Sequence, residues 1–470
     1  MTTVSVILLT IILLLVLLVV RAPIALALGI SGAVGLVLLE GTAYATASIV
    51  GPTFSNAYSF SLVIVPMFIL MGLFAVRANI AEYVFDIAAH LTKRLPGGLG
   101  VATVVASAGF AAVSGSSIGT VATMSKLSVS EMRKHGYPAS LATSLVAVSG
   151  TLGVLIPPST FLVLYAVMAQ VSVAQILVAG ILPGLLSAVA LIIYIMTFGA
   201  RKIRESGRLD SDAIAENNDT EAVVRATIKS QQSRSLKELF WRGLFYIVLL
   251  FGIIIGGMYS GLFTATEAAA FGALAAVVIL IWEQRRSGLR GIVTHIRDAL
   301  LDTSATTSMV FFILFGSVIL SQFFVAARVP TLVRDILIDL GLSPGVMMAI
   351  LLAFLIPLGM FLESLSLLLL SVPILVPLAS EFAVEMMPPG HEGLVLVWLG
   401  IVLVKLIEIG LITPPVGMNI FVVAGVTRTP SETVFRGVLP LFIVDLVVTV
   451  ILFLFPWVSI LLPSLIQTTI

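Results

Sequence analysis

The sequence of 470 residues contains no cysteine. Disulfide bonds and thiol-based redox chemistry are therefore excluded, although this absence leaves the cellular compartment open. Charged residues are also scarce: Asp, Glu, Lys and Arg make up 10% of the chain, against about a quarter in soluble domains. The formal net charge is only +1, which argues against nucleic acid as a partner.

Residues that carry catalytic chemistry are few as well. The four histidines are His90, His135, His295 and His391, and no two of them have the spacing of metal ligands. We therefore predict that they lie at the surface. The sequence has no Gly-x-x-x-x-Gly-Lys-Ser/Thr loop, which disfavours an ATP-driven pump. A membrane-embedded enzyme would need a nucleophile, a base or a metal inside its spans, and no such set is found, so we predict that the chain is not an enzyme.

Apolar residues, in contrast, are abundant. Hydrophobic residues make up 59% of the chain, and the mean hydropathy is +1.17. Apolar stretches of about 20 residues, enough to cross about 30 Å of hydrocarbon as a helix, recur along the chain. The first, residues 4–20, lacks a basic start and a cleavage pattern and is predicted to be a retained span. Because backbone groups in lipid must pair within their own segment, the predicted fold class is an all-α polytopic membrane protein.

One polar segment, residues 201–242, interrupts the apolar pattern. Many of its Lys and Arg residues lie close to the flanking spans, and the positive-inside rule places such a segment in the cytoplasm. We therefore predict a first half, residues 1–200, a cytoplasmic linker, residues 201–242, and a second half, residues 243–470. A tolerated insertion without a function of its own is the simplest interpretation of the linker.

The two halves contain matching motifs. Residues 153–159 resemble residues 410–416, and residues 180–183 resemble residues 437–440, both at an offset of 257 residues. A shared offset across separate motifs indicates an internal repeat. The charges of the two copies differ: residues 77–134 contain six basic residues, whereas residues 324–395 contain two. Because Lys and Arg set orientation, this difference predicts an inverted-topology repeat, which is common in secondary transporters.

Each half contains a candidate hairpin. In residues 97–127 a cluster of small polar residues from Ser114 to Thr120 separates two short apolar runs. This cluster fits the tip of a re-entrant hairpin, whose hydroxyls and carbonyls suit Na⁺, or a small-residue packing face between helices, and the local residues leave both open. In residues 344–380 the corresponding tip carries Glu363. A carboxylate in so apolar a setting could ligate a cation, carry a proton, orient a substrate or cap the following helix.

Each half also contains a candidate broken helix. Pro157-Pro158 and Pro414-Pro415 interrupt long apolar stretches around residues 150–160 and 410–417, because proline removes an amide donor. Freed carbonyls at a break can coordinate a cation, and half-helix N-termini favour an anion. Asn419 adds a further oxygen to the second break. A simple kink is the alternative, which the repetition of the feature disfavours.

Taken together, these motifs resemble the large permease subunit of tripartite ATP-independent periplasmic (TRAP) transporters, the DctM-like family. The similarity extends over nearly the whole chain. The motifs that carry it are residues 114–117, 136–138, 150–159, 261–270, 359–363 and 413–417. The resemblance implies an elevator-type transporter of the bacterial inner membrane that is driven by Na⁺ and imports a small carboxylate. It also implies two protein partners, a small membrane subunit of about four helices and a periplasmic substrate-binding protein.

The resemblance further implies a set of site residues. Substrate would contact Ser114, Ser159 and Glu363, where the family more often has aspartate in place of Glu363. Na⁺ would lie beside both hairpin tips and both helix breaks, near Ser114, Ser116, Ser117, Gly150, Gly153, Gly359, Gly410, Thr413 and Gly417. A stand-alone sodium/dicarboxylate symporter has a similar architecture and is the alternative function. It would transport without a binding protein.

Overall fold

The computed structural model describes residues 2–205, 241–360 and 362–467, and these residues form helices and no strand. The predicted linker lies mostly outside the described residues. The helices of the first half are α1 Thr3–Val19, α2 Ile24–Ala57, α3 Ile64–Arg77, α4 Ile80–Thr92, α5 Gly98–Ser114, α6 Ser117–Met124, α7 Ser130–Lys134, α8 Ala139–Ser149, α9 Leu152–Leu155, α10 Thr160–Ala169, α11 Val173–Ala179 and α12 Ile181–Tyr194. Those of the second half are α15 Arg242–Phe251, α16 Gly257–Tyr259, α17 Ala265–Glu283, α18 Gly288–Ala326, α19 Val329–Asp339, α20 Pro344–Ala353, α21 Leu355–Gly359, α22 Ser364–Phe382, α23 Val395–Gly410, α24 Met418–Thr427, α25 Ser431–Leu454 and α26 Trp457–Gln467.

The chain is a multi-pass membrane protein. Eight stretches of the described residues are at least 18 residues long and apolar enough to cross a membrane. Helix α1, the first predicted span, has 17 residues and is therefore at the short end of the spanning range. Large apolar side chains are exposed along α1 and α2, among them Leu8, Ile12 and Leu26, as expected of surfaces that face lipid or another apolar partner rather than water.

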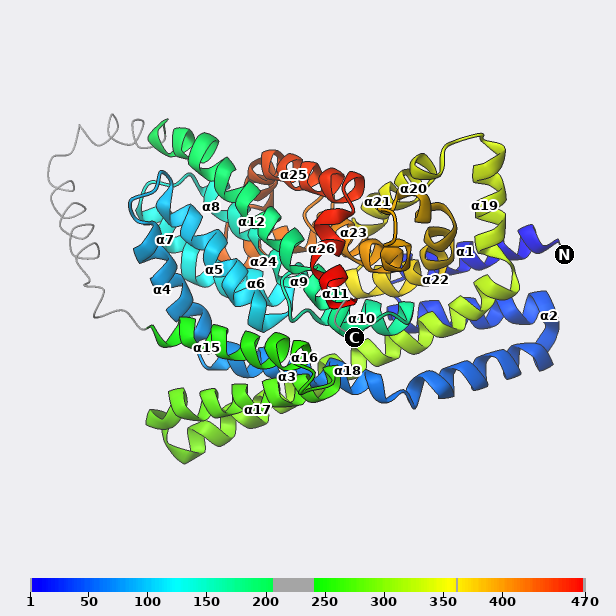
Figure 1. Cartoon of the computed structure of the whole chain (residues 1–470), viewed down its shortest axis with the longest axis horizontal. Coiled ribbons are helices and arrows are strands. Elements are labelled where there is room, and N and C mark those ends of the chain that lie inside the picture. The colour runs from blue at the N-terminus through cyan, green and yellow to red at the C-terminus, as the bar shows by residue number, and fades with distance from the viewer. Residues whose placement is uncertain (1, 206–240, 361, 468–470) are drawn as a thin grey trace, which may run out of the picture.

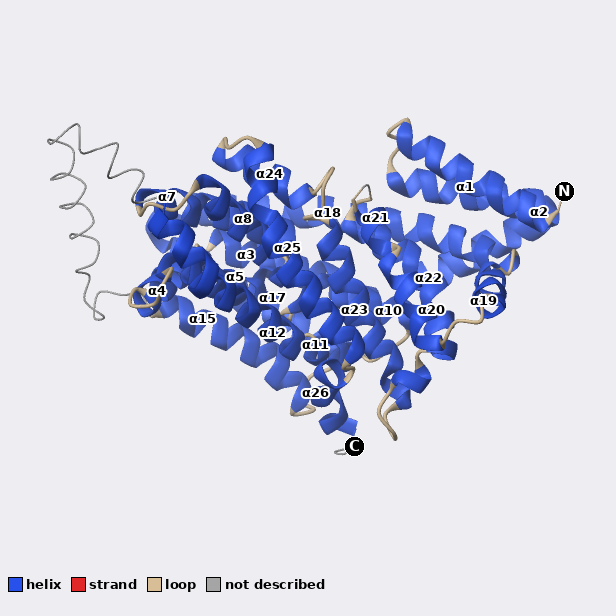
Figure 2. Ribbon diagram, turned by 90° about the horizontal axis from the view of Figure 1, so that it is seen from above, coloured by secondary structure: helices blue, strands red, loops and turns tan. Residues whose placement is uncertain are grey.

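Long helices run along one side of the molecule, and the shorter ones gather beside them. Helix α2 packs along α18, and α17 packs along α3 (Figure 1). The short helices α5, α6, α8 and α9 lie in one part of the molecule, and α20, α21 and α22 lie in another, with α23 between them (Figure 1). Helices α1 and α2 lie together at the edge of the molecule that holds the N-terminus (Figure 2).

The same order of elements occurs in both halves. A helix, a non-helical tip and a second helix are formed by α5 and α6 in the first half and by α20, α21 and α22 in the second. An interrupted helix follows in each half, formed by α8, α9 and α10 and then by α23 and α24. The second arm of the first hairpin continues beyond the predicted end at residue 127, through a π-helical turn at Ser125–Val129 into α7. The inverted orientation of the two halves stays a prediction.

The paired prolines lie at the two helix interruptions. Helix α9 ends at Leu155 and α10 begins at Thr160, and the segment Ala139–Leu155 is bent by 42° from Thr160–Ala169. Helix α23 ends at Gly410 and α24 begins at Met418. Proline supplies no amide hydrogen to the preceding turn, so the ladder of backbone hydrogen bonds stops at both places. Non-helical backbone is thereby placed inside the bundle twice.

Candidate functional site

The first hairpin tip is tied together by its own side chains. Gly115 has a positive φ of 59° and lets the chain turn between α5 and α6. The Ser116 hydroxyl then caps α6 by accepting a hydrogen bond from the Gly119 amide at 3.2 Å. The hydroxyls of Ser114 and Thr120 lie 2.8 Å apart across the tip, and Thr120 also donates to the Ser116 carbonyl at 2.8 Å. The tip is therefore an ordered group of oxygen atoms.

This tip packs directly against the first helix break. A methyl group added at Gly153 would lie 2.8 Å from the Ser116 carbonyl oxygen, and one added at Gly115 would lie 2.9 Å from the Pro158 carbonyl oxygen. Both contacts involve backbone atoms, so only glycine fits without displacing the tip. Ser159 is fully buried at the same break, and its hydroxyl caps α10 by accepting from the Leu162 amide at 3.3 Å. The structure thus brings the predicted residues of the first half together.

In the second hairpin Glu363 caps a helix. Its carboxylate accepts hydrogen bonds from both the amide and the hydroxyl of Ser366, each at 3.2 Å, at the start of α22. The capping role considered from the sequence is therefore present in the structure. Glu363 is also half-buried rather than enclosed. The cap occupies one of its oxygens, Oε2, in both hydrogen bonds, so the carboxylate keeps acceptor capacity for a ligand.

The second hairpin contacts the second break through two glycines. A methyl group at Gly410 would lie 2.7 Å from the Gly359 Cα atom, so the two backbones approach as closely as glycine permits. Beyond Gly410, the Thr413 hydroxyl donates to the Ile409 carbonyl at 2.5 Å. Gly417 has a positive φ of 54° and immediately precedes α24 as its N-cap residue. The predicted residues of the second half therefore also lie around one junction.

A buried asparagine joins the two junctions. The Asn419 amide nitrogen, Nδ2, donates to the Ser117 hydroxyl at 2.9 Å and lies 3.5 Å from the Ala147 carbonyl oxygen. Asn419 follows the second break, whereas Ser117 belongs to the first hairpin tip. One hydrogen bond thus connects segments that are 302 residues apart in the sequence.

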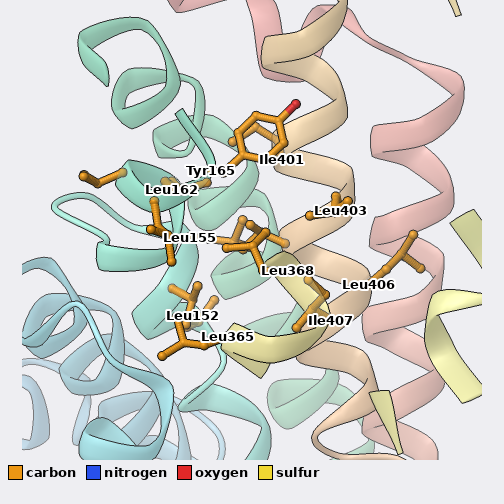
Figure 3. Packing of buried hydrophobic residues seen from close by; sticks show 14 of the residues in the cluster. Leu152, Leu155, Leu162, Tyr165, Leu365, Leu368, Ile401, Leu403, Leu406 and Ile407 are labelled. Carbon is orange, nitrogen blue, oxygen red and sulfur yellow. The ribbon is translucent and has the colours of Figure 1, made fainter. Parts of the chain in front are cut away.

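An apolar layer lies between these junctions. Leu152 and Leu155 of the first break lie near Leu365 and Leu368 of α22, and α23 packs on the same group (Figure 3). All four leucines are buried. Because lipid is as apolar as leucine, the layer holds the second hairpin against the first break through close van der Waals packing rather than through removal of apolar surface from water.

Three charged residues are buried among the apolar helices α23 and α25. Lys405 and Glu408 belong to α23 and Asp445 to α25, and none of them is more than 1% exposed. The Lys405 ammonium contacts the Asp445 carboxylate. Glu408 lies beside the Ser117 hydroxyl and is acted on by the charges of Lys405, Asp445 and Glu363. Both hairpin tips and the other buried charged residues therefore lie close to Glu408, inside the protein.

The chain was also compared with known proteins. The family model described as "Tripartite ATP-independent periplasmic transporter, DctM component" matches residues 11–458. The chain belongs to this family. The resemblance seen in the sequence motifs is thereby confirmed, and the family is one of transporter permeases rather than enzymes. A tripartite transporter has three components, so this large permease is implied to act with a small membrane subunit and a periplasmic binding protein.

Relatives of this TRAP permease differ in their named substrates. A C4-dicarboxylate TRAP transporter large permease protein, DctM, of Pseudomonas aeruginosa is 32% identical over 437 residues, which cover 93% of each chain. A sialic acid TRAP transporter large permease protein, SiaM, of Vibrio cholerae is 32% identical over 407 residues, which cover 87% of each chain. Equal identity to both means that overall similarity does not select a substrate.

A solved structure shares the fold of this TRAP permease. The crystal structure of the Alcanivorax borkumensis YdaH transporter, reported to reveal an unusual topology, matches with a TM-score of 0.52 at 14% sequence identity and covers 89% of each chain. At this low identity the likeness establishes the fold alone. It supports the predicted fold class of an all-α polytopic membrane protein.

Sequence reasoning missed the buried charges of this TRAP permease. Lys405 and Glu408 interrupt the apolar run of α23, and Asp445 interrupts that of α25. An ionisable residue inside a membrane span is costly and marks a functional or pairing role. That signal is present in the sequence for all four residues, but only Glu363 also lies at a predicted hairpin tip.

Proposed function

We propose that this TRAP permease imports a small carboxylate across the bacterial inner membrane, driven by co-transport of Na⁺. A periplasmic binding protein would deliver the substrate, and a small membrane subunit of about four helices would complete the membrane part. The observation that carries the proposal is the convergence of both hairpin tips and both helix breaks on one buried polar region. Backbone carbonyl and hydroxyl oxygens that are not used in helical hydrogen bonds can coordinate a transported cation at membrane depth.

Two Na⁺ positions are proposed, one at each junction. The first is proposed beside the tip residues Ser114, Ser116 and Ser117 and the break residues Gly150 and Gly153, where Gly153 packs on the Ser116 carbonyl. A side chain at Gly153 would collide with the Ser116 carbonyl, so glycine there allows the tip to lie against the break, whereas Gly150 packs on the Val121 side chain of α6.

The second Na⁺ position lies where Gly359 meets Gly410, with Thr413 and Gly417 on the following turn. Because the Thr413 hydroxyl donates its hydrogen to Ile409, its oxygen lone pairs remain available to a cation.

The substrate position is proposed between Ser114, Ser159 and Glu363. The names of the two relatives include C4-dicarboxylate and sialic acid, and both ligands carry carboxylate groups. Glu363 would repel such an anion directly, so Na⁺ at the adjacent junction is needed to balance the charge. This requirement gives a physical reason for coupling, because the anion binds well only when the cation is already present.

The movement is proposed to be an elevator motion. The hairpins and broken helices are held to one another by the glycine contacts, the Asn419–Ser117 hydrogen bond and the apolar layer of Figure 3. The long helices α2, α3, α17 and α18 pack among themselves on another side of the molecule (Figure 1). The first group would move as one body past the second, carrying substrate and Na⁺ together.

Reconstitution tests the proposal. The permease would be placed in proteoliposomes with its small subunit, and uptake of a radiolabelled C4-dicarboxylate or sialic acid would be measured with the cognate binding protein outside. We expect uptake only with an inward Na⁺ gradient and only with the binding protein present. Uptake by the permease alone would instead support a stand-alone sodium/dicarboxylate symporter. Uptake that is unchanged when choline replaces Na⁺ would refute sodium coupling.

A further inference from the structure

A fully buried glutamate lies next to the proposed cation positions and has no ion-pair partner among the described residues. Glu408 belongs to the last turn of α23, two residues before Gly410, and has no exposed surface. Within the described residues, neither of its carboxylate oxygens makes a hydrogen bond of normal geometry. An ionised carboxylate in this state is costly and needs a compensating positive charge.

The nearby positive charge is already engaged. Lys405 lies one turn before Glu408, but its ammonium contacts Asp445 on α25. Asp445 and Glu363 both repel the charge of Glu408, so three carboxylates share a single ammonium. The C-terminal end of a helix also carries partial negative charge, which disfavours an anion in the last turn of α23. The protein alone therefore leaves Glu408 undercompensated.

The surroundings of Glu408 are rich in acceptors that lack donors. Both oxygens of Glu408, Oδ1 of Asn419 and Oδ2 of Asp445 are buried and have no hydrogen-bond partner in the part of the chain that the structure describes. The amide nitrogen of Asn419 donates to Ser117, and the Ser117 hydroxyl lies beside the Glu408 carboxylate. A proton on Glu408 would neutralise the carboxylate and would donate a hydrogen bond to only one further acceptor. A hard metal cation gathers several oxygens at once, which fits this environment better.

We propose that Glu408 and Asn419, with Ser117 shared with the first proposed Na⁺ position, form a further Na⁺ site, which connects the first hairpin tip to the second helix break. The inference rests on the proposed function, because it requires Na⁺ as the coupling ion. Na⁺ at this position neutralises the buried carboxylate and holds Ser117 to α23 and α24. Na⁺ binding therefore joins the first hairpin tip to the second helix break. The Asn419–Ser117 hydrogen bond alone connects them more weakly.

Sodium-dependent stability of the purified complex of permease and small subunit tests this site. Thermal unfolding would be followed while NaCl replaces choline chloride at constant ionic strength. Glu408→Gln keeps the size of the side chain and removes its charge. We expect this variant to be at least as stable as the wild type without Na⁺, and to need about ten- to a hundredfold more Na⁺ for half-maximal stabilisation.

A matched control distinguishes the loss of the proposed site from the general effect of removing one negative charge. Glu432 is an exposed glutamate on α25 that pairs with Arg436 at 2.6 Å, and none of its oxygens is among the buried atoms without a hydrogen-bond partner. Glu432→Gln should leave the sodium response unchanged. Asn419→Ala removes a proposed ligand of the same site that belongs to α24. It should also raise the Na⁺ concentration for half-maximal stabilisation, so the proposal stays testable if Glu408→Gln does not fold.

The outcomes distinguish this inference from the proposed function. A wild-type sodium response that both Glu408→Gln and Asn419→Ala leave unchanged overturns the further site and leaves sodium coupling intact. A wild type without any sodium response overturns both. A proton in place of Na⁺ would also overturn the site: wild-type stability in choline would rise as the pH falls, and Glu408→Gln would keep the normal sodium response.

Discussion

Replacing Gly410 by alanine should separate the second hairpin from the second helix break. The added methyl would lie 2.7, 2.9 and 3.1 Å from the Cα, carbonyl carbon and carbonyl oxygen of Gly359. Carbon atoms normally approach to about 3.5–4.0 Å. Overpacking of this kind costs about 1–3 kcal/mol. Because all three close atoms are backbone and cannot rotate away, we expect a cost near 3 kcal/mol.

Substitution of the facing glycine gives a graded comparison. A methyl at Gly359 would lie 3.1 Å from the Gly410 Cα atom and 3.3 Å from a methyl carbon of Leu367, which is a looser fit. Gly359→Ala should therefore cost about 1 kcal/mol, at the lower end of the same range. The matched control is Gly425→Ala in α24, where an added methyl meets no atom within 4 Å. This control should gain about 0.5–1 kcal/mol from helix propensity.

The assay combines stability with sodium response. The variants would be purified in detergent with the small subunit, and their unfolding would be followed with and without NaCl. We expect stability to fall in the order Gly425→Ala, Gly359→Ala, Gly410→Ala, and the Na⁺ concentration for half-maximal stabilisation to rise in that order. A Gly410→Ala protein with wild-type stability and sodium response would refute the close approach of the two backbones. A larger effect at Gly359 than at Gly410 would refute the reasoning about overlap.

Three further predictions concern the polar residues. Ser114→Ala removes the hydroxyl that lies 2.8 Å from that of Thr120, which costs about 1 kcal/mol, and should reduce sodium-driven uptake without reducing the amount of permease inserted in the membrane. Glu363→Gln should likewise lower uptake per inserted molecule, and normal uptake by both variants would remove the assigned substrate position. Lys405→Met leaves Asp445 buried without its partner and should destabilise the protein by about 3–5 kcal/mol, whereas adding Asp445→Leu should restore most of the loss in a denaturation experiment.

The sequence was informative where a local residue determines the local structure. Pro157-Pro158 and Pro414-Pro415 remove backbone donors wherever the chain goes, so both helix interruptions could be predicted. The hairpin tips followed from short polar clusters between apolar runs. Their contacts did not follow from any local rule. The Asn419–Ser117 bond joins residues 302 positions apart, and it depends on how α24 packs on α6.

The buried charges were missed for a related reason. Lys405 and Asp445 are 40 residues apart on different helices, and only the packing of α23 against α25 makes them a pair. From the sequence, each is a single costly charge in an apolar run, and such a charge can be satisfied by a partner, by a ligand or by the helix end. Proximity in the sequence does not identify the partner, because Glu408 lies three residues from Lys405, yet Lys405 pairs with Asp445.

Helix α23 explains how one cation could influence both halves. It carries Gly410 against the second hairpin, Glu408 beside the first hairpin tip, and Lys405 against α25. A rigid helix with contacts on three sides transmits a displacement at one of them to the others. Coupling between two ligands typically amounts to about 1–3 kcal/mol, whereas one neutral hydrogen bond such as Asn419–Ser117 contributes about 1 kcal/mol. The hydrogen bond therefore accounts for only part of such coupling, and a cation held by Glu408 on this same helix would supply the remainder.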